Sequence, residues 1–298
     1  MQHHYLGNSS LYVSVLSFGC MSLGEDHGTN ARLIHQAHDG GINLFDTADL
    51  YQKGFNEETV GRAIKGRRDK VILATKVGNE WMPDGLSWRW NPTKQYILSA
   101  VEKSLRRLDT DYIDLYQLHG GTIDDPIDEV IEAFELLVER GWIRAYGISS
   151  IRPNVIREYV TRSRISSVMM QYSLLDRRPE EMAFPLLAES EVSVLVRGGL
   201  AKGLLVDKPA RPYLDYETDE ISAFQAQLAD IAGEDYETGH LALQFARFPT
   251  PVASVVAGIR TPEQLAYSLI GIRQPQLNDA FLEALSGGFP ALQYQAHR

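Results

Sequence analysis

The chain of 298 residues contains a single cysteine, Cys20, so it can form no disulfide bond within itself. A lack of disulfides is typical of proteins in a reducing compartment. No run of 18 apolar residues occurs, and the first five residues, Met-Gln-His-His-Tyr, carry no apolar signal core. We therefore expect a cytoplasmic protein that is neither exported nor inserted into a membrane.

Positive charge is also scarce. The 29 Lys and Arg residues are outnumbered by 39 Asp and Glu residues, which gives a net charge of −10. Proteins that bind nucleic acid usually present a basic face, so we expect no nucleic-acid partner. The excess of acidic residues is typical of a solvated surface that favours solubility.

Two glycine-rich phosphate-binding motifs are absent. The turn after the first predicted strand reads Gly19-Cys-Met-Ser-Leu-Gly24, which does not match the Gly-x-Gly-x-x-Gly pattern of open doubly wound sheets. No P-loop motif occurs either. No His-x-x-Glu-His or paired-histidine spacing is present, so we predict no metal site.

Short apolar runs rich in β-branched residues alternate with segments of helical periodicity along the whole chain. Eight such runs predict strands at 13–18, 42–46, 71–75, 112–118, 143–148, 167–171, 192–196 and 252–256. Eight strands alternating with helices over about 250 residues are typical of a closed parallel barrel. We therefore predict an α/β fold, a (β/α)8 TIM barrel that forms a single domain over residues 1–298.

The boundaries of several elements can be predicted from local signals. Residues 92–108 carry apolar side chains at helical spacing, with Thr93 as the expected N-cap, and residues 128–139 form a similar helix that Gly141 ends. Residues 6–13 predict an N-terminal β-hairpin with its turn at Gly7-Asn-Ser-Ser. We expect irregular structure at 208–218 and after Leu285.

Ionisable residues follow three neighbouring predicted strands. Asp46, Lys76 and His119 lie at the ends of the second, third and fourth strands, and Tyr51 follows Asp46 by five residues. Barrels of this class build their active sites at the carboxyl ends of the strands. Each residue alone could be a turn cap, a solvated charge or a packing residue, but their coincidence at one rim favours a functional site.

The four side chains make a consistent acid–base set. A tyrosine hydroxyl ordinarily titrates near ~10, and a neighbouring ammonium lowers its pKa. A carboxylate beside the ammonium keeps the lysine charged, and a histidine can orient and polarise a substrate oxygen. The set therefore predicts the interconversion of a carbonyl and an alcohol.

Five segments resemble the signature motifs of the aldo-keto reductases, and the chain is most similar to bacterial members. They lie at 41–51, 74–76, 112–119, 141–149 and 170–175, within a resemblance that extends from Leu6 to Leu269. The resemblance implies a (β/α)8 barrel that transfers a hydride from NADPH to an aldehyde or ketone. It implies Tyr51 as the general acid, Lys76 as the residue that depresses its pKa, Asp46 as the partner of Lys76, and His119 as the group that orients the substrate.

The same resemblance implies the residues that bind NADP(H). The positions that usually hold the nicotinamide carboxamide are Ser149, Ser150 and Gln171, with Ser150 in place of the more common Asn. Arg197 occupies the position of an aromatic residue that stacks on the nicotinamide, and a guanidinium can also stack on a ring.

The loop after the eighth predicted strand resembles the adenosine-phosphate loop of the family and includes Gly258, Arg260 and Gln264. The guanidinium of Arg260 suits a 2′-phosphate, and the helix that begins near Pro262 adds free N–H groups. The Glu-Asn pair that contacts adenine in the family is replaced by Tyr267-Ser268.

Three tryptophans, Trp81, Trp88 and Trp90, lie in the loop after the third predicted strand. They can form an apolar wall for the substrate, or they can pack the loop onto the barrel. Both interpretations stay open, and the identity of the carbonyl substrate is not predicted.

Two other functions are compatible with the pattern. The first is an NADP(H)-binding regulatory or redox-sensing subunit with little turnover, like the channel-associated members of the family. The second is a lyase of unrelated ancestry that uses Lys76 to form a Schiff base.

Overall fold

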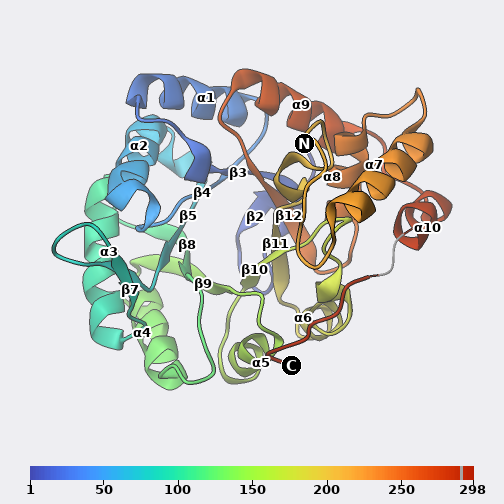
Figure 1. Cartoon of the computed structure of the whole chain (residues 1–298). Coiled ribbons are helices and arrows are strands. Elements are labelled where there is room, and N and C mark those ends of the chain that lie inside the picture. The colour runs from blue at the N-terminus through green and yellow to red at the C-terminus, as the bar shows by residue number, and fades with distance from the viewer. Residues whose placement is uncertain (289–290) are drawn as a thin grey trace.

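The computed structural model describes residues 1–288 and 291–298. Within this part of the chain eight parallel strands close into a barrel (Figure 1). Their order around the barrel follows the chain: β3 (Leu16–Gly19), β4 (Leu44–Asp46), β5 (Ile72–Val77), β8 (Ile113–Leu118), β9 (Ile143–Ser149), β10 (Ser167–Gln171), β11 (Ser193–Arg197) and β12 (Val252–Gly258). The predicted (β/α)8 barrel is confirmed, and each of its strands overlaps a predicted one.

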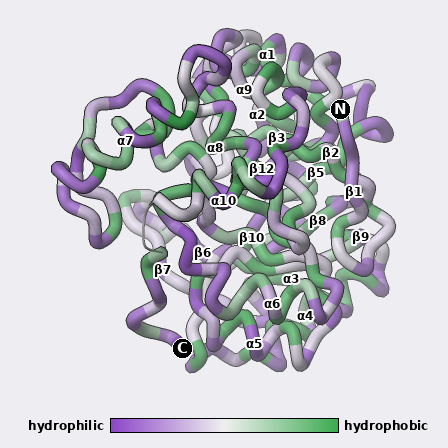
Figure 2. Tube along the Cα trace, turned by 90° about the vertical axis from the view of Figure 1, so that its right-hand side faces the viewer, coloured by the Kyte–Doolittle hydropathy of each residue, from purple (hydrophilic) through white to green (hydrophobic). Residues whose placement is uncertain are grey.

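The helices lie outside the barrel and surround it (Figure 1). They are α1 (His27–Asp39), α2 (Phe55–Ile64), α3 (Lys94–Leu108), α4 (Ile127–Glu139), α5 (Pro153–Arg162), α6 (Ala183–Glu189), α7 (Thr218–Ala232), α8 (Thr238–Arg247), α9 (Pro262–Arg273) and α10 (Asp279–Gly287). In Figure 2 a helix such as α7 carries both hydrophilic and hydrophobic positions. This mixture is expected of a helix that packs one face on a barrel.

Local signals account for the two helices whose ends were predicted. The Thr93 side chain accepts a hydrogen bond from the backbone N–H of Tyr96 and caps α3. Gly141, which follows the C-cap of α4, has a φ of 71°. Glycine adopts this left-handed conformation at little cost, so the helix ends there.

The N-terminal hairpin consists of β1 (His3–Tyr5) and β2 (Tyr12–Ser14), which pair antiparallel. The prediction of a hairpin is confirmed, but Val13 belongs to β2 rather than to the first barrel strand. The hairpin turn lies against the beginning of two barrel strands, because the Gly7 N–H donates to Ser193 Oγ over 2.7 Å and Ser166 donates to Asn8. The hairpin therefore covers the amino end of the barrel.

Two apolar clusters hold the fold together. The larger one lies between strands and helices. The smaller one fills the barrel interior and joins hairpin residues to inward-facing strand residues: Leu6, Leu11, Val13, Leu44, Ala74, Leu115, Ala145, Met169, Leu195, Ala253 and Val256. Because this interior is packed, a site can form only above it, at the carboxyl ends of the strands.

Connections between elements carry further secondary structure. The short strands β6 (Asn79–Trp81) and β7 (Trp88–Trp90) form a hairpin between β5 and α3. The predicted irregular segment 208–218 precedes α7, which begins at its last residue. The expected irregular tail begins later than predicted, because α10 continues to Gly287; residues 289–290 of that tail lie outside the described part of the chain.

Candidate active site

The strand repeat places polar residues directly above the apolar interior. Along a strand, residues two apart point to the same side. Asp46 follows the interior residue Leu44 by two positions, and the same spacing joins Ala74 to Lys76. Three more strands repeat this spacing between an interior residue and a polar one: Leu115 and Gln117 on β8, Met169 and Gln171 on β10, and Leu195 and Arg197 on β11. The carboxyl end of the barrel therefore opens onto a polar layer.

Asp46 and Lys76 form a buried ion pair in this layer. Lys76 Nζ lies 2.7 Å from Asp46 Oδ2, and it also donates to the carbonyl oxygen of Thr47 over 2.8 Å. Only 1% of the Lys76 side chain and 6% of the Asp46 side chain are exposed. Burial alone would lower the pKa of Lys76, but the charge of Asp46 and the neighbouring Tyr51 raise it above its usual value. The lysine is therefore charged at neutral pH.

The Tyr51 hydroxyl lies at hydrogen-bonding distance from this pair. Lys76 Nζ is 3.5 Å from the Tyr51 oxygen and 5.1 Å from the centre of its ring. Burial raises the pKa of Tyr51, and the charge of Lys76 opposes this shift without cancelling it. Lys76 therefore acts in the expected direction on the pKa of Tyr51, but desolvation of the phenolate outweighs the attraction of the cation, so the net shift is upward.

His119 completes the group of four. Its ring meets that of Tyr51 edge to face, with 5.7 Å between the ring centres. Burial and the charges of Lys76 and Arg197 lower the pKa of His119 to about 3. Its Nδ1 atom is buried and has no hydrogen-bond partner among the described residues. The ring is therefore neutral, and a neutral imidazole can donate one hydrogen bond and accept another.

The backbone that carries Tyr51 adopts an uncommon conformation. Gln52, Lys53 and Gly54 have φ values of 49°, 56° and 89°. Residues other than glycine rarely adopt this left-handed backbone conformation. At Gly54 a Cβ atom would lie only 2.6 Å from Cδ of Arg107. Glycine is therefore required at the end of this turn.

The predicted nicotinamide-binding residues lie on the opposite part of the same rim. Ser149, Gln171 and Arg197 end the consecutive strands β9, β10 and β11. Arg197 Nη1 donates to Gln171 Oε1 over 3.0 Å. The Ser150 hydroxyl accepts a hydrogen bond from the backbone N–H of Arg152.

The amide of Gln171 has a fixed orientation. Its Nε2 atom donates to Asp176 over 2.8 Å and to the Tyr213 hydroxyl over 3.2 Å. Asp176 itself receives two hydrogen bonds of 2.7 Å from Arg178. These contacts occupy both donor hydrogens of the amide and leave one acceptor position on its oxygen.

The third group lies where β12 ends and α9 begins. Gly258 is the last residue of β12, and Gln264 Oε1 accepts from the backbone N–H of Arg260 over 3.1 Å. Thr261 caps α9 by accepting from the Gln264 N–H. No ion pair of the Arg260 side chain occurs within residues 1–288 and 291–298. A guanidinium without a carboxylate partner beside a helix N-terminus fits a phosphate group.

The three tryptophans of the β6–β7 hairpin have different surroundings. Trp90 donates to Asp125 over 2.9 Å and packs against Gly78, so it attaches the hairpin to the barrel. The Trp81 indole donates to the carbonyl oxygen of Leu50, next to Tyr51, over 3.2 Å. Trp88 is 52% exposed. The packing interpretation holds for Trp90, and Trp81 contacts the segment that carries Tyr51.

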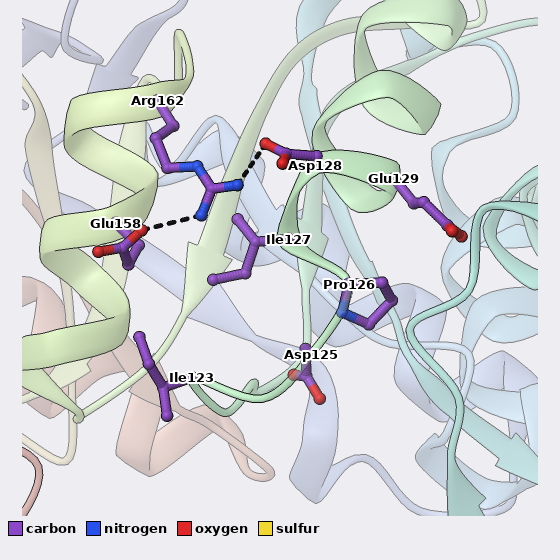
Figure 3. Close-up of a pocket in the computed structure, with 8 residues that line it drawn as sticks. All are labelled: Ile123, Asp125, Pro126, Ile127, Asp128, Glu129, Glu158 and Arg162. Atoms are coloured by element: carbon purple, nitrogen blue, oxygen red, sulfur yellow. Dashed lines mark hydrogen bonds and ion pairs between the residues drawn. The ribbon is translucent and has the colours of Figure 1, made fainter.

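A separate hollow lies between the loop before α4 and helix α5 (Figure 3). Arg162 reaches across it to Glu158 and Asp128. Its lining contains none of the predicted site residues: Ile123, Asp125, Pro126, Ile127, Asp128, Glu129, Glu158 and Arg162. The coupled charges at the barrel mouth therefore identify the candidate site, and the hollow does not.

Two further contacts belong to the site and were not predicted. Gln117 Nε2 lies 3.4 Å from Asp46 Oδ1, opposite the lysine. Gln117 lies on β8 two residues before His119, which directly follows that strand, and this spacing could have indicated the contact. The second contact joins Gln171 to Asp176, and no local pattern marks Asp176. No cluster of metal-ligating side chains occurs in the described part of the chain, and none of the helices described there could span a membrane.

Comparisons with known proteins find one matching family model and several similar chains. The model of the Aldo/keto reductase family matches residues 15–286. The chain is 48% identical to "Uncharacterized oxidoreductase YqkF" of Bacillus subtilis over 100% of both proteins. It is 34% identical to "Aldo-keto reductase yakc [NADP(+)]" of Schizosaccharomyces pombe, over 67% of this chain and 61% of that protein.

One solved structure is similar to this chain over its whole length. The holo form of aldo-keto reductase AKR11C1 from Bacillus halodurans is 50% identical and has a TM-score of 0.96. The match covers 100% of this chain and 99% of that chain.

Proposed function

Since the chain belongs to the aldo-keto reductase family, we propose that it reduces an aldehyde or ketone to an alcohol with NADPH as the hydride donor. Aldo-keto reductases are oxidoreductases that use NADP(H), which is the cofactor that membership implies. When bound, NADPH supplies the hydride that reduces the carbonyl carbon. The protein must supply a proton to the carbonyl oxygen.

Tyr51 is the proposed proton donor, and its distance of 3.5 Å from Lys76 Nζ is the observation that carries the proposal. Transfer of the hydroxyl proton to the carbonyl oxygen leaves a phenolate on Tyr51. The ammonium of Lys76 stabilises that phenolate, because opposite charges at this distance favour the ionised form. Asp46 keeps the ammonium charged and in place.

His119 is proposed to orient the substrate. With a pKa of about 3 the ring is neutral throughout the physiological range. A neutral ring donates a hydrogen bond to the carbonyl oxygen without competing with Tyr51 as an acid. Its Nδ1 atom is closed to solvent and has no partner among the described residues, so the contact with the substrate is assigned to Nε2.

The other rim residues are proposed to hold the cofactor. Ser149, Ser150 and Gln171 would bind the nicotinamide carboxamide, Gln171 through the free acceptor position of its oxygen. Arg197 would lie against the nicotinamide ring, where its planar guanidinium can stack.

The adenosine end of the cofactor is assigned to the loop after β12. The main chain at Gly258 and the side chains of Arg260 and Gln264 would surround the 2′-phosphate, with the N-terminus of α9 adding favourable N–H groups. The absence of a carboxylate partner for Arg260 in the described part of the chain supports this role.

The test measures the oxidation of NADPH in the presence of a panel of aldehydes and ketones. The loss of NADPH absorbance monitors the reaction. We expect turnover with at least one carbonyl compound and formation of the corresponding alcohol. Tight NADPH binding without turnover across the panel would instead support a sensor or regulatory subunit. Trapping of substrate on Lys76 by borohydride would support a Schiff-base lyase, but the buried ion pair of Lys76 disfavours the free amine that this chemistry needs.

We place this reaction in the cytoplasm, with a small carbonyl compound as the partner and neither nucleic acid nor membrane involved. The single cysteine, Cys20, is buried and supports a reducing compartment. The acidic net charge of −10 disfavours a nucleic-acid ligand.

A further inference from the structure

We propose that Trp81 is a positioning residue for Tyr51, which it acts on by anchoring the backbone turn that carries the tyrosine. This inference rests on the proposed role of Tyr51 as the proton donor. Trp81 belongs to β6, the first strand of the hairpin after β5, and Tyr51 begins the turn after β4. Thirty-one positions therefore separate the indole from the Leu50 carbonyl that it binds.

The turn that Trp81 contacts does not hold its conformation through local preference. Gln52 and Lys53 both have positive φ values, 49° and 56°, although neither is glycine. Such residues persist in this conformation only when their surroundings impose it. Contacts from other segments must therefore maintain the turn.

Trp81 provides two of these contacts. Its Nε1–H donates to the Leu50 carbonyl oxygen over 3.2 Å, the same oxygen that accepts a longer bond of 3.4 Å from the Lys53 N–H. The ammonium of Lys53 lies 5.4 Å from the centre of the Trp81 ring, a cation–π distance. The indole therefore holds the turn at the residues before and after Tyr51.

The opposite end of the turn is fixed from the barrel side. Gly54 packs directly against Arg107, whose Nε donates to the fully buried Glu57 over 2.6 Å. Glu57 also accepts from the Thr75 hydroxyl over 2.6 Å, and Thr75 precedes Lys76 on β5. This end is tied to the strand that bears the lysine. The residue before Leu50 is tied there as well, because the Asp49 N–H donates to the Lys76 carbonyl oxygen over 3.3 Å, so the hairpin contributes the contact at the Leu50 carbonyl itself.

Trp81 consequently helps to set the separation between Tyr51 and Lys76, beside the backbone contact of Asp49 with Lys76. That separation is 3.5 Å, at the outer limit of a hydrogen bond, so a small displacement of the turn breaks the contact. Loss of the contact weakens the influence of Lys76 that lowers the pKa of Tyr51, while burial continues to raise that pKa. The predicted signature is a slower chemical step together with a higher pKa for the proton donor.

The experiment compares Trp81→Phe with Trp88→Phe in the full-length enzyme. Phenylalanine keeps an aromatic ring beside Lys53 but lacks the indole N–H. Trp88 is the control because it pairs directly with Trp81 across the hairpin and is 52% exposed. Steady-state kcat and KM, the pH profile of kcat, the Kd for NADPH and the melting temperature are measured for each variant.

We expect Trp81→Phe to lower kcat by about 10- to 100-fold, since small misplacements of a reacting group cost this much. The alkaline limb of the kcat profile should move to higher pH, with the KM of the carbonyl substrate and the Kd for NADPH little changed. Trp88→Phe should match the wild type. The inference is overturned if Trp81→Phe matches Trp88→Phe, or if it lowers kcat without moving the alkaline limb.

Two additional variants keep the outcome decisive. If Trp81→Phe does not fold, the exposed Lys53→Met tests the other contact and should shift the alkaline limb in the same direction; an unchanged limb overturns the inference. Tyr51→Phe separates the two proposals. Wild-type turnover of Tyr51→Phe refutes the proposed function, whereas an inactive Tyr51→Phe beside a fully active Trp81→Phe refutes only the role of Trp81.

Discussion

Lys76 Nζ and Asp46 Oδ2 lie 2.7 Å apart inside the barrel mouth, and both side chains are at least nine-tenths buried. A buried charge without a partner is unstable, so each of these residues requires the other. The pair therefore has two consequences, one for the stability of the fold and one for the acidity of Tyr51.

Asp46→Asn should destabilise the protein strongly. It leaves the buried Lys76 without its counter-charge, and breaking a buried pair in this way typically costs about 3–5 kcal/mol. The matched control is Lys65→Met, which breaks the exposed pair with Asp109 at 3.2 Å and should cost roughly 0–1 kcal/mol. Urea unfolding measures both, and equal losses would show that the buried pair does not contribute as described.

His119 should make the protein less stable in acid. Its pKa is about 3 in the folded protein against 6.5 when exposed, so the unfolded chain binds a proton that the folded chain excludes. The contribution of the neutral ring to stability is complete above pH 6.5 and falls as the pH decreases towards 3. His119→Gln should lose less stability than the wild type as the pH falls below 6.5, as followed by unfolding curves.

The exposed His4 offers the control, because His4→Gln should retain the pH dependence of the wild type. A wild-type pH dependence in His119→Gln would contradict the assignment of a buried neutral ring.

Gly54→Ala should destabilise the turn of Tyr51 more than a comparable change elsewhere. At Gly54 the φ of 89° and the close approach of Arg107 act together. At Gly66 the φ is 78°, but no atom lies within 4 Å of the position that a Cβ would take. Gly66→Ala should therefore lower the free energy of unfolding by the backbone strain alone, about 1–2 kcal/mol. Gly54→Ala should lower it by clearly more. Chemical denaturation compares the two, and equal losses would argue against a tightly fixed turn.

Arg260→Ala should weaken NADPH binding much more than NADH binding. A charge-assisted hydrogen bond to phosphate is worth about 1.5–3 kcal/mol, or roughly 10- to 100-fold in affinity. Only NADPH carries the 2′-phosphate that Arg260 is proposed to bind. Fluorescence titrations of this variant and of Arg62→Ala, at an exposed position on α2, measure the difference. Similar losses for both cofactors would exclude the 2′-phosphate role.

The strands and the rim residues could be predicted from sequence because both follow from a regular repeat. Apolar runs mark the strands, and residues two positions beyond the interior layer, such as Asp46 and Lys76, must point into the barrel mouth. The boundary at Val13 was missed because residues 11–18 pass from β2 into β3 without a Gly, Pro or Asn to mark a turn.

The remaining features depend on contacts between segments that are distant along the chain. The hydrogen bond from Trp81 to Leu50 and the orientation of Gln171 by Asp176 and Tyr213 arise only when loops meet at the rim. The net pKa shift of Tyr51 likewise depends on how deeply the folded protein buries the hydroxyl. Spacing along a sequence does not report burial of this kind.

The most direct test of the account is the turnover of Tyr51→Phe. Tyr12→Phe in the N-terminal hairpin is the control, since Tyr12 is 49% exposed and remote from the rim. With a carbonyl substrate identified by the NADPH screen, Tyr51→Phe should reduce it about 10²- to 10⁴-fold more slowly while binding NADPH with wild-type affinity. Turnover of Tyr51→Phe equal to that of Tyr12→Phe would contradict the account.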